Sequence, residues 1–203
     1  INHAERIMEI ARSAGVPVLF DGSQSAVHIP VDMQALGCDF FVFTGHKLYG
    51  PSGIGALYAK GDWLDRLPPF MGGGEMIADV FEDRLTFADP PHKFEAGTPP
   101  IANAIGLGAA IRWLERHDRH AIMAHEGALM ARAVAGMAQI EGVRMIGTAR
   151  DKGAIISFAM EGAHPHDIAQ ILDKYGIAIR PGHHCPQPLH RHLGVSSTAP
   201  PSF

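Results

Sequence analysis

The sequence lacks the features that define several large classes of protein. It contains only two cysteines, Cys38 and Cys185, too few for a disulfide framework, so a reducing, cytoplasmic compartment is expected. No apolar run approaches the roughly 18 residues that a membrane-spanning helix needs. No basic block is present, and 17 Lys and Arg stand against 21 Asp and Glu, a formal charge of −4. A protein that follows a nucleic-acid backbone needs the opposite sign, so we expect neither nucleic acid nor membrane as a partner.

The two ends of the sequence lead us to expect an internal piece of a longer protein. The first segment, INHAERIMEIARSAG, already has helical periodicity, and Asn2 with Glu5 has the spacing of a capping box. It lacks the basic start, apolar core and cleavage site of a signal peptide. The last segment, SSTAPPSF, contains no closing helix.

Apolar periodicity predicts alternating helices and strands, which is typical of an α/β fold. The expected strands cover residues 18–20, 40–43, 53–59, 143–146, 155–159 and 177–180. The expected helices cover residues 1–14, 32–37, 62–67, 101–117, 121–140 and 166–175. Residues 68–99 are expected to form a long irregular loop with a functional or interface role. We place a domain boundary near residue 118, so that residues 1–117 form a larger domain and residues 118–203 a smaller α/β domain.

Polar side chains follow two predicted strands in the first half of the chain. Asp21 ends the first strand in FDGSQSA, and His46 and Lys47 follow the second in FVFTGHKLYGPSGIG. Functional groups of open α/β sheets collect at the carboxyl ends of strands. If Lys47 points into the mouth of the sheet, burial would leave a nucleophilic amine. A lysine for a Schiff base and a carboxylate for a pyridinium nitrogen together indicate a pyridoxal phosphate (PLP) site.

Taken one at a time, these residues have simpler interpretations. Asp21 at the end of a strand is typical of a turn or a helix cap. Lys47 in a glycine-rich loop is typical of a solvated surface, and Thr44 and His46 would then only satisfy backbone groups of the loop. Only the order and spacing of the four residues favour the PLP interpretation.

A second group lies in the segment IAIRPGHHCPQPL. Cys185 follows an apolar strand beside His183 and His184, and cationic neighbours favour the reactive thiolate form of a cysteine. A loop cysteine without function remains an alternative, as does a metal site. The residues of that metal site would be His183, His184, Cys185, His190 and His192, although their spacing is not one of the usual zinc patterns. Cys38 is expected to be a small buried hydrophobe.

Four separated segments in the same order carry a resemblance to a known family. They are FDGSQSAVHIPVDMQALGCDFFVFTGHKLYGPSGIGALY, MGGGEMI, KFEAGTPPIANAIGLGAAI and IAIRPGHHCPQPL. From Val18 to about Ser202 the sequence resembles the SufS-type (group II) cysteine desulfurases, in the class V aminotransferase group of fold-type I PLP enzymes. The resemblance implies a C-terminal fragment: part of the large PLP-binding domain, with a mixed, mostly parallel sheet and flanking helices, followed by a small α/β domain. Because the strands of the family's N-terminal half are missing, an unpaired sheet edge is left, and we expect this piece to fold poorly by itself.

The resemblance also implies a role for each cofactor-binding residue. Lys47 would bind PLP as a Schiff base, and Asp21 would pair with the pyridine nitrogen. Gln24 would hydrogen-bond the phenolic oxygen of the ring. Thr44 and His46 would bind the phosphate.

For catalysis, the resemblance implies that Cys185 takes the sulfur of L-cysteine as a persulfide and leaves L-alanine. Arg180 and His184 are the expected substrate-binding residues. Thr98, in EAGTP, would reach the cofactor of a neighbouring subunit, so a homodimer is expected. The sulfur would then pass to an acceptor protein for iron–sulfur cluster assembly.

One departure from the family pattern keeps alternatives open. Where the family has an Arg that binds the substrate carboxylate through two hydrogen bonds, this sequence has Pro200. A catalytically inactive remnant or a binding module is therefore one alternative. A selenocysteine lyase, or another class V enzyme acting on a different amino acid, is a second.

Overall fold

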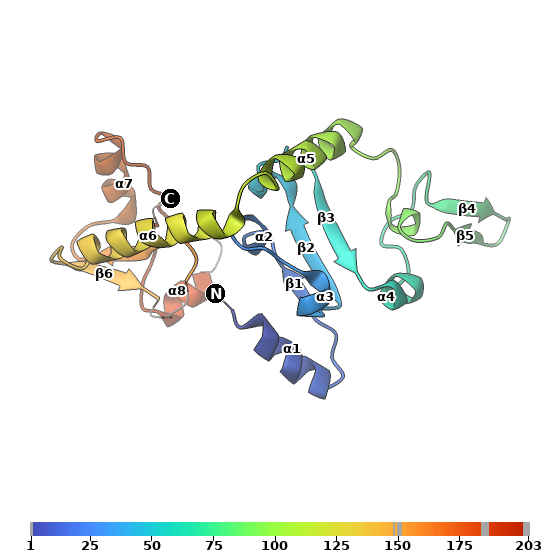
Figure 1. Cartoon of the computed structure of the whole chain (residues 1–203), viewed down its shortest axis with the longest axis horizontal. Coiled ribbons are helices and arrows are strands. Elements are labelled where there is room, and N and C mark those ends of the chain that lie inside the picture. Colours follow the sequence, from blue (N-terminus) through green and yellow to red (C-terminus); the bar gives the residue numbers. More distant parts are fainter. Residues whose placement is uncertain (1, 148, 150–151, 184–186, 201–203) are drawn as a thin grey trace. The chain divides into compact units, whose positions relative to one another are not determined.

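The computed structural model describes residues 2–147, 149, 152–183 and 187–200. These residues divide into two compact units, one of residues 2–119 and the other beginning at His120. Each unit has its own paired strands (Figure 1). Each also has its own buried cluster of side chains. Within the described ranges, no helix combines the length and the apolar character needed to cross a membrane.

The first unit is built on a three-stranded mixed sheet in the order β1-β2-β3. Strand β1 (Leu19–Asp21) pairs parallel to β2 (Phe40–Thr44), and β2 pairs antiparallel to β3 (Gly55–Ala59). All three were expected from the apolar runs. Their register places Asp21 beside Val42 and Thr44 beside Gly55. The carboxyl ends of β1 and β2 therefore lie at one edge of the sheet, together with the start of β3.

The core beneath this sheet holds Met8, Cys38 and Phe41, each at most 3% exposed. Phe41 comes from the central strand and Met8 from helix α1 (Ala4–Ser13). The prediction that Cys38 is a small buried hydrophobe is confirmed, and its burial raises the pKa of the thiol above the ordinary value. A thiol of this kind stays protonated and unreactive.

Local signals determine where the short helices of this unit begin and end. Helix α3 (Met33–Leu36) starts at Asp32, whose carboxylate accepts from the backbone N–H groups of Gln34 and Ala35, and it ends at Gly37 with φ 65°. The predicted capping box of α1 is wrong. The residue before that helix is His3 and no side chain caps it, because the helix starts one residue later than the Asn2–Glu5 spacing requires.

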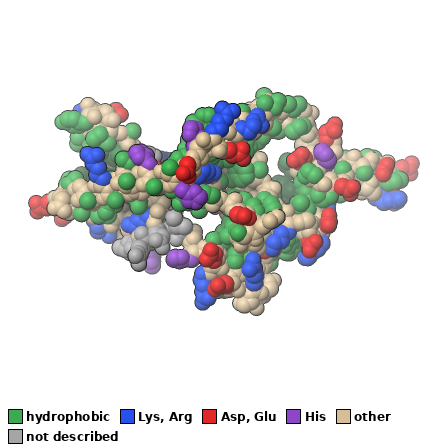
Figure 2. Space-filling view, viewed as in Figure 1, with side chains coloured by type: hydrophobic (Ala, Val, Ile, Leu, Met, Phe, Trp, Pro, Cys, Tyr) green, Lys and Arg blue, Asp and Glu red, His purple; other side chains and the backbone are tan. Residues whose placement is uncertain are grey.

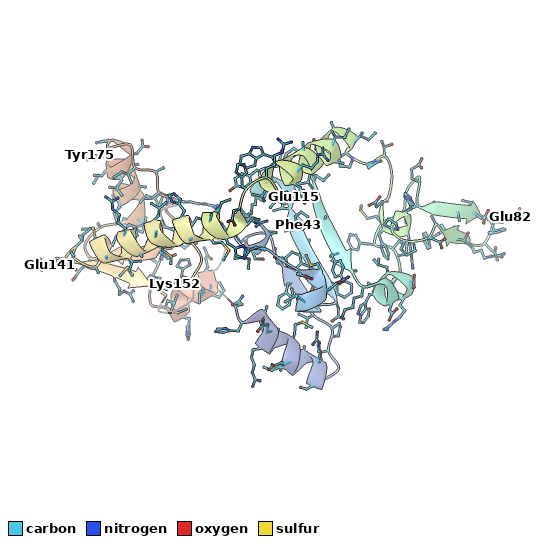
Figure 3. The ribbon with its side chains drawn as sticks, in the orientation of Figure 1. Phe43, Glu82, Glu115, Glu141, Lys152 and Tyr175 are labelled. Carbon is cyan, nitrogen blue, oxygen red and sulfur yellow. The ribbon has the colours of Figure 1, made fainter. Side chains whose placement is uncertain are left out.

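The prediction that residues 68–99 are irregular is wrong in part. After α4 (Gly61–Arg66), strands β4 (Ile77–Val80) and β5 (Leu85–Phe87) form an antiparallel hairpin, and a 3-10 turn, η2 (His92–Phe94), follows. A register shift between Ile77 and Asp79 obscures the alternation that marks a strand. The hairpin extends away from the three-stranded sheet, with Glu82 at its tip (Figures 1 and 3). Helix α5 (Ile101–Leu114) then returns to the sheet side of the unit, where Asn103 Nδ2 donates to the Ser52 carbonyl at 3.1 Å.

The described residues of the second unit form two strands and three helices. Its elements are α6 (Arg119–Met137, whose first residue belongs to the first unit), β6 (Val143–Ile146), β7 (Ser157–Met160), α7 (Pro165–Asp173) and α8 (Gln187–His192). Strands β6 and β7 are antiparallel, and Phe158, Ile168 and Ala199 form the buried cluster.

The strand expected at 177–180 is not a regular strand. Instead, Gly182 forms an isolated bridge with Thr198, and the Arg180 N–H donates to the Pro200 carbonyl at 3.0 Å.

On the face shown in Figure 2, Lys and Arg side chains are interspersed with Asp and Glu side chains. The described residues on this face form no patch of a single charge sign.

Candidate functional site

The polar residues singled out in the first half of the sequence are brought to one edge of the three-stranded sheet. Asp21 is the last residue of β1 and Thr44 is the last residue of β2. Because these strands are parallel neighbours, the loops that follow them leave the sheet side by side. The Gly22 N–H donates to the Val42 carbonyl at 2.7 Å, which extends this pairing into the first loop. The structure therefore places Asp21 and the Thr44–Lys47 segment at a shared edge, as strand-end chemistry requires.

The carboxylate of Asp21 is held by its own loop. The Ser23 backbone N–H donates to Asp21 Oδ1 at 2.9 Å. Hydrogen bonds from the Ser23 hydroxyl and from this N–H lower the pKa of Asp21 below its ordinary value, and the positive charge of Lys47 adds a smaller effect in the same direction. Asp21 therefore remains ionised near neutral pH. It can face a cationic group without giving up its charge.

The Thr44–His46 pair forms a second polar group at the same edge. Thr44 Oγ1 and His46 Nδ1 are 2.7 Å apart, at the start of the 3-10 turn η1 (Gly45–Lys47). A hydroxyl and an imidazole in contact offer hydrogen-bond donors to an anion.

The turn after Thr44 is tightly built. The Leu48 and Gly50 N–H groups both donate to the Gly45 carbonyl at 2.9 Å. Gly45 is buried, and a Cβ at this position would lie 2.9 Å from the Ile54 carbonyl oxygen. Tyr49 has φ 59°, a left-handed conformation that costs a non-glycine residue about 1–2 kcal/mol. Its ring contacts Trp113 of α5, with centroids 5.6 Å apart. The hydrogen bonds to the Gly45 carbonyl and the contact between Tyr49 and Trp113 therefore hold the turn in one conformation.

Lys47 lies within this turn with an exposed side chain. The burial that the sequence analysis considered as a condition for this lysine is therefore not met in this structure. Its charge nevertheless acts on Asp21. The chain thus places an accessible primary amine within electrostatic reach of an ionised carboxylate.

The two remaining residues of the first unit are accessible but lie on different segments. Gln24 immediately precedes the one-turn helix α2 (Ser25–His28) and is exposed. Thr98 is exposed just before α5, in a segment anchored by the Gly97 N–H, which donates to the Gly74 carbonyl at 2.8 Å. No hydrogen bond within the described part of the chain joins Thr98 to the strand-end residues. Its expected role, toward a neighbouring subunit, stays a prediction.

The second group of candidate residues lies in the other unit. Arg180 and His183 are exposed, whereas His184 and Cys185 lie outside the described residues. Among the residues that the structure describes, no set of three or more His, Cys, Asp or Glu side chains is placed to hold a metal ion. His190 is buried instead, with Nε2 3.3 Å from Thr198 Oγ1.

Sequence reasoning missed the residues that support the site. Ser23 is the main cause of the low pKa of Asp21, and its signal was present, because an Asp followed two residues later by Ser favours a turn closed by the carboxylate. Arg119 had no such signal. Its Nη2 donates to the carbonyls of Ala26, Val27 and Ile29, some 90 positions earlier in the chain.

Comparison with known sequences gives one consistent result. The family model described as Aminotransferase class-V matches residues 1–203. The chain is 48% identical over 203 residues to "Probable cysteine desulfurase 1" of Mycobacterium leprae (strain TN), covering 100% of this chain and 33% of that protein. It is 49% identical over 204 residues to "Probable cysteine desulfurase" of Streptomyces coelicolor, covering 100% of this chain and 49% of that protein. The chain thus spans a third to a half of the length of these curated relatives.

Solved structures show the same fold. The cysteine desulfurase CsdA of Escherichia coli superposes with a TM-score of 0.94 at 42% identity, covering 99% of this chain and 50% of that one. The cystine C-S lyase C-DES, solved with its reaction product cysteine persulfide, superposes with a TM-score of 0.80 at 26% identity, covering 98% and 52%. The predicted α/β fold with a mixed sheet and flanking helices is confirmed.

Proposed function

Because the chain belongs to the aminotransferase class V family, we propose that it is part of a PLP-dependent cysteine desulfurase. The reaction would convert L-cysteine to L-alanine and leave the sulfur on the enzyme as a persulfide. The observation that carries the proposal is the juxtaposition of Asp21, Thr44, His46 and Lys47 at one edge of the sheet. The names of the sequence relatives and of CsdA support the choice of substrate.

The chemistry of these side chains fits PLP group by group. Lys47 supplies an accessible amine for the aldehyde of the cofactor, and Asp21 supplies a carboxylate that its loop keeps ionised. Thr44 and His46 supply donors for the phosphate, and Gln24 supplies an amide for the phenolic oxygen. When bound, PLP supplies an electron sink that stabilises the negative charge left by the departing α proton of the substrate.

Each residue then has a defined task. Asp21 would hold the proton on the ring nitrogen, because its low pKa keeps the negative charge that this proton requires. Lys47 Nζ would move the α proton once it is released from the cofactor. The thiolate of Cys185 would form a bond to the substrate sulfur as the carbon–sulfur bond breaks, with Arg180 and His184 binding the substrate.

The remaining parts of the proposal rest on the resemblance. The persulfide sulfur would pass to an acceptor protein for iron–sulfur cluster assembly. A second copy of the chain would receive Thr98 at its cofactor, giving a homodimer in the cytoplasm. Membership of the SufS-type subgroup also stays a prediction.

The direct test is trapping of bound PLP with borohydride, followed by peptide mass mapping of the full-length protein. We expect one reduced adduct, on Lys47, and none in the Lys47→Ala variant. A protein that carries no adduct, or that carries it on other lysines, would contradict the PLP assignment. Formation of alanine and a persulfide from L-cysteine then separates a desulfurase from other class V activities.

A further inference from the structure

A single arginine side chain binds the C-terminal end of α2, the short helix that follows the loop after Asp21. Arg119 Nη2 donates to the carbonyl oxygens of Ala26 at 2.7 Å, Val27 at 2.8 Å and Ile29 at 3.1 Å. The first two carbonyls belong to α2, and the third belongs to the residue that ends it. Arg119 is partly buried and lies in the same compact unit as α2.

Helix α2 needs this support because it is only four residues long. A single turn is far below the length at which a helix is stable in water. The last carbonyls of any helix have no partner within the helix, and positive charge at that end is favourable. At the other end of α2, the side chain of Gln24 makes no capping hydrogen bond. Arg119 supplies both a positive charge and hydrogen-bond donors to the carbonyl groups at the C-terminal end.

The position of α2 is transmitted directly to Asp21. The Ala26 N–H donates to the Gly22 carbonyl at 2.8 Å, and Ser25 Oγ donates to the same oxygen at 3.3 Å. Gly22 is adjacent to Asp21, and its own N–H donates a hydrogen bond to the Val42 carbonyl. A shift of α2 would therefore move the backbone between Asp21 and Gln24. These are the two residues proposed to contact the cofactor ring.

We propose that Arg119 is a positioning residue for PLP, acting through α2 on Asp21 and Gln24. This inference rests on the proposed function, because it assigns a cofactor-binding consequence to the contact. Without the guanidinium, the end of α2 loses these three hydrogen bonds and the loop occupies more conformations. The carboxylate and the amide then meet the ring in the correct place less often, and the cofactor binds more weakly.

The test compares Arg119→Met, Arg119→Lys and Arg116→Met in the full-length protein. Methionine keeps much of the apolar stem of arginine and removes the donors, while lysine keeps the charge but not the planar fork. Arg116 is the matched control. It lies three residues earlier, and its exposed side chain has no hydrogen bond or ion pair with the described residues. Two quantities are measured: the dissociation constant of PLP for the cofactor-free protein, and amide hydrogen exchange over residues 20–30 without PLP.

We expect Arg119→Met to weaken PLP binding about tenfold, because hydrogen bonds to a charged group are among the stronger ones in proteins. Exchange should accelerate over residues 22–29 but not over β2 or β3. Arg119→Lys should fall between Arg119→Met and the wild type, and Arg116→Met should match the wild type. An unchanged PLP affinity in Arg119→Met would overturn the inference. So would accelerated exchange across the whole sheet, which would indicate a general structural role.

The two proposals fail in different ways. If the wild-type protein binds no PLP, the proposed function is contradicted and the inference falls with it. If the wild type binds PLP on Lys47 and Arg119→Met binds it equally well, only the inference is contradicted.

Discussion

Lys60 Nζ donates a hydrogen bond to Asp39 Oδ1 at 2.9 Å, while Asp39 Oδ2 accepts from the Val18 backbone N–H at 2.9 Å. One carboxylate thereby joins the segments that precede β1 and β2 to the residue that follows β3. The Lys60 ammonium also donates to the Gly37 carbonyl at 3.0 Å. This cluster lies at the end of the sheet opposite the candidate site. It fixes the alignment that places Asp21 beside Val42.

The first prediction concerns the stability that this carboxylate provides. The hydrogen bond from Lys60 is the main cause of a lowered pKa of Asp39, with a smaller effect from the Val18 N–H. Asp39→Asn should lower the free energy of unfolding by about 1 kcal/mol near neutral pH, a modest figure because Lys60 is partly exposed to solvent.

The sign of the pH dependence follows from the lowered pKa. The contribution is complete above the ordinary carboxyl pKa of about 3.9 and is lost as the pH falls through the lower folded-state value. Denaturant unfolding of the full-length protein near neutral pH and near pH 3 should therefore show a gap between wild type and Asp39→Asn that narrows in acid. A gap that is constant with pH would argue against the ion pair.

The second prediction separates the chemical role of Asp21 from any role in binding PLP. Asp21→Asn should still bind PLP at Lys47 but should slow exchange of the α proton of alanine in deuterated water by about 100-fold or more, because a neutral amide cannot stabilise a proton on the ring nitrogen. Ser23→Ala provides a graded comparison, since it raises the pKa of Asp21 by removing the hydroxyl hydrogen bond. Equal exchange rates in wild type and Asp21→Asn would remove Asp21 from the chemistry.

A third prediction uses the two cysteines as matched variants. Cys185→Ala should abolish persulfide formation from L-cysteine while leaving α-proton exchange intact, because the thiol acts after the proton is removed. Cys38→Ala should keep the persulfide and lower the melting temperature, since Cys38 is fully buried in the core of the first unit. Mass spectrometry of the intact protein after addition of L-cysteine distinguishes them. A persulfide that survives in Cys185→Ala would assign the nucleophile elsewhere.

The fourth prediction tests the close packing of Gly22, the residue directly after β1, against the central strand. A Cβ added to Gly22 would fall within the ring of Phe41, the buried residue of the central strand. Gly22→Ala should therefore destabilise the full-length protein by about 1–3 kcal/mol and weaken PLP binding. Gly61→Ala is the control, because a Cβ there would meet no atom within 4 Å. If both variants melt at the wild-type temperature, the described contact between Gly22 and Phe41 is wrong.

Elements with strong local signals were predicted well. The apolar runs predicted β1, β2, β3 and β6 within two residues, and the helical turn expected over residues 32–37 is α3 with its two caps. Elements without such signals were missed. The β4–β5 hairpin has an interrupted alternation, and α2 is too short to show a helical period. The apolar run at 177–180 has the composition of a strand but forms no regular strand. The pairing in this region is limited to an isolated bridge between Gly182 and Thr198 and a hydrogen bond from Arg180 to Pro200.

The order of residues establishes which side chains the site can use: an Asp and a Lys after two apolar strands, and a Thr and a His before that Lys. It also contains the ordered set of segments that placed the chain in its family. Composition and spacing suffice for this because they record residue types and short-range order. The folded structure is what makes β1 and β2 parallel neighbours, so that Asp21 and Thr44 lie at one edge of the sheet. It also decided that Lys47 is exposed and that Arg119 supports α2. Such facts depend on hydrogen bonds and packing between residues far apart in the chain, which leave no periodic trace in the sequence.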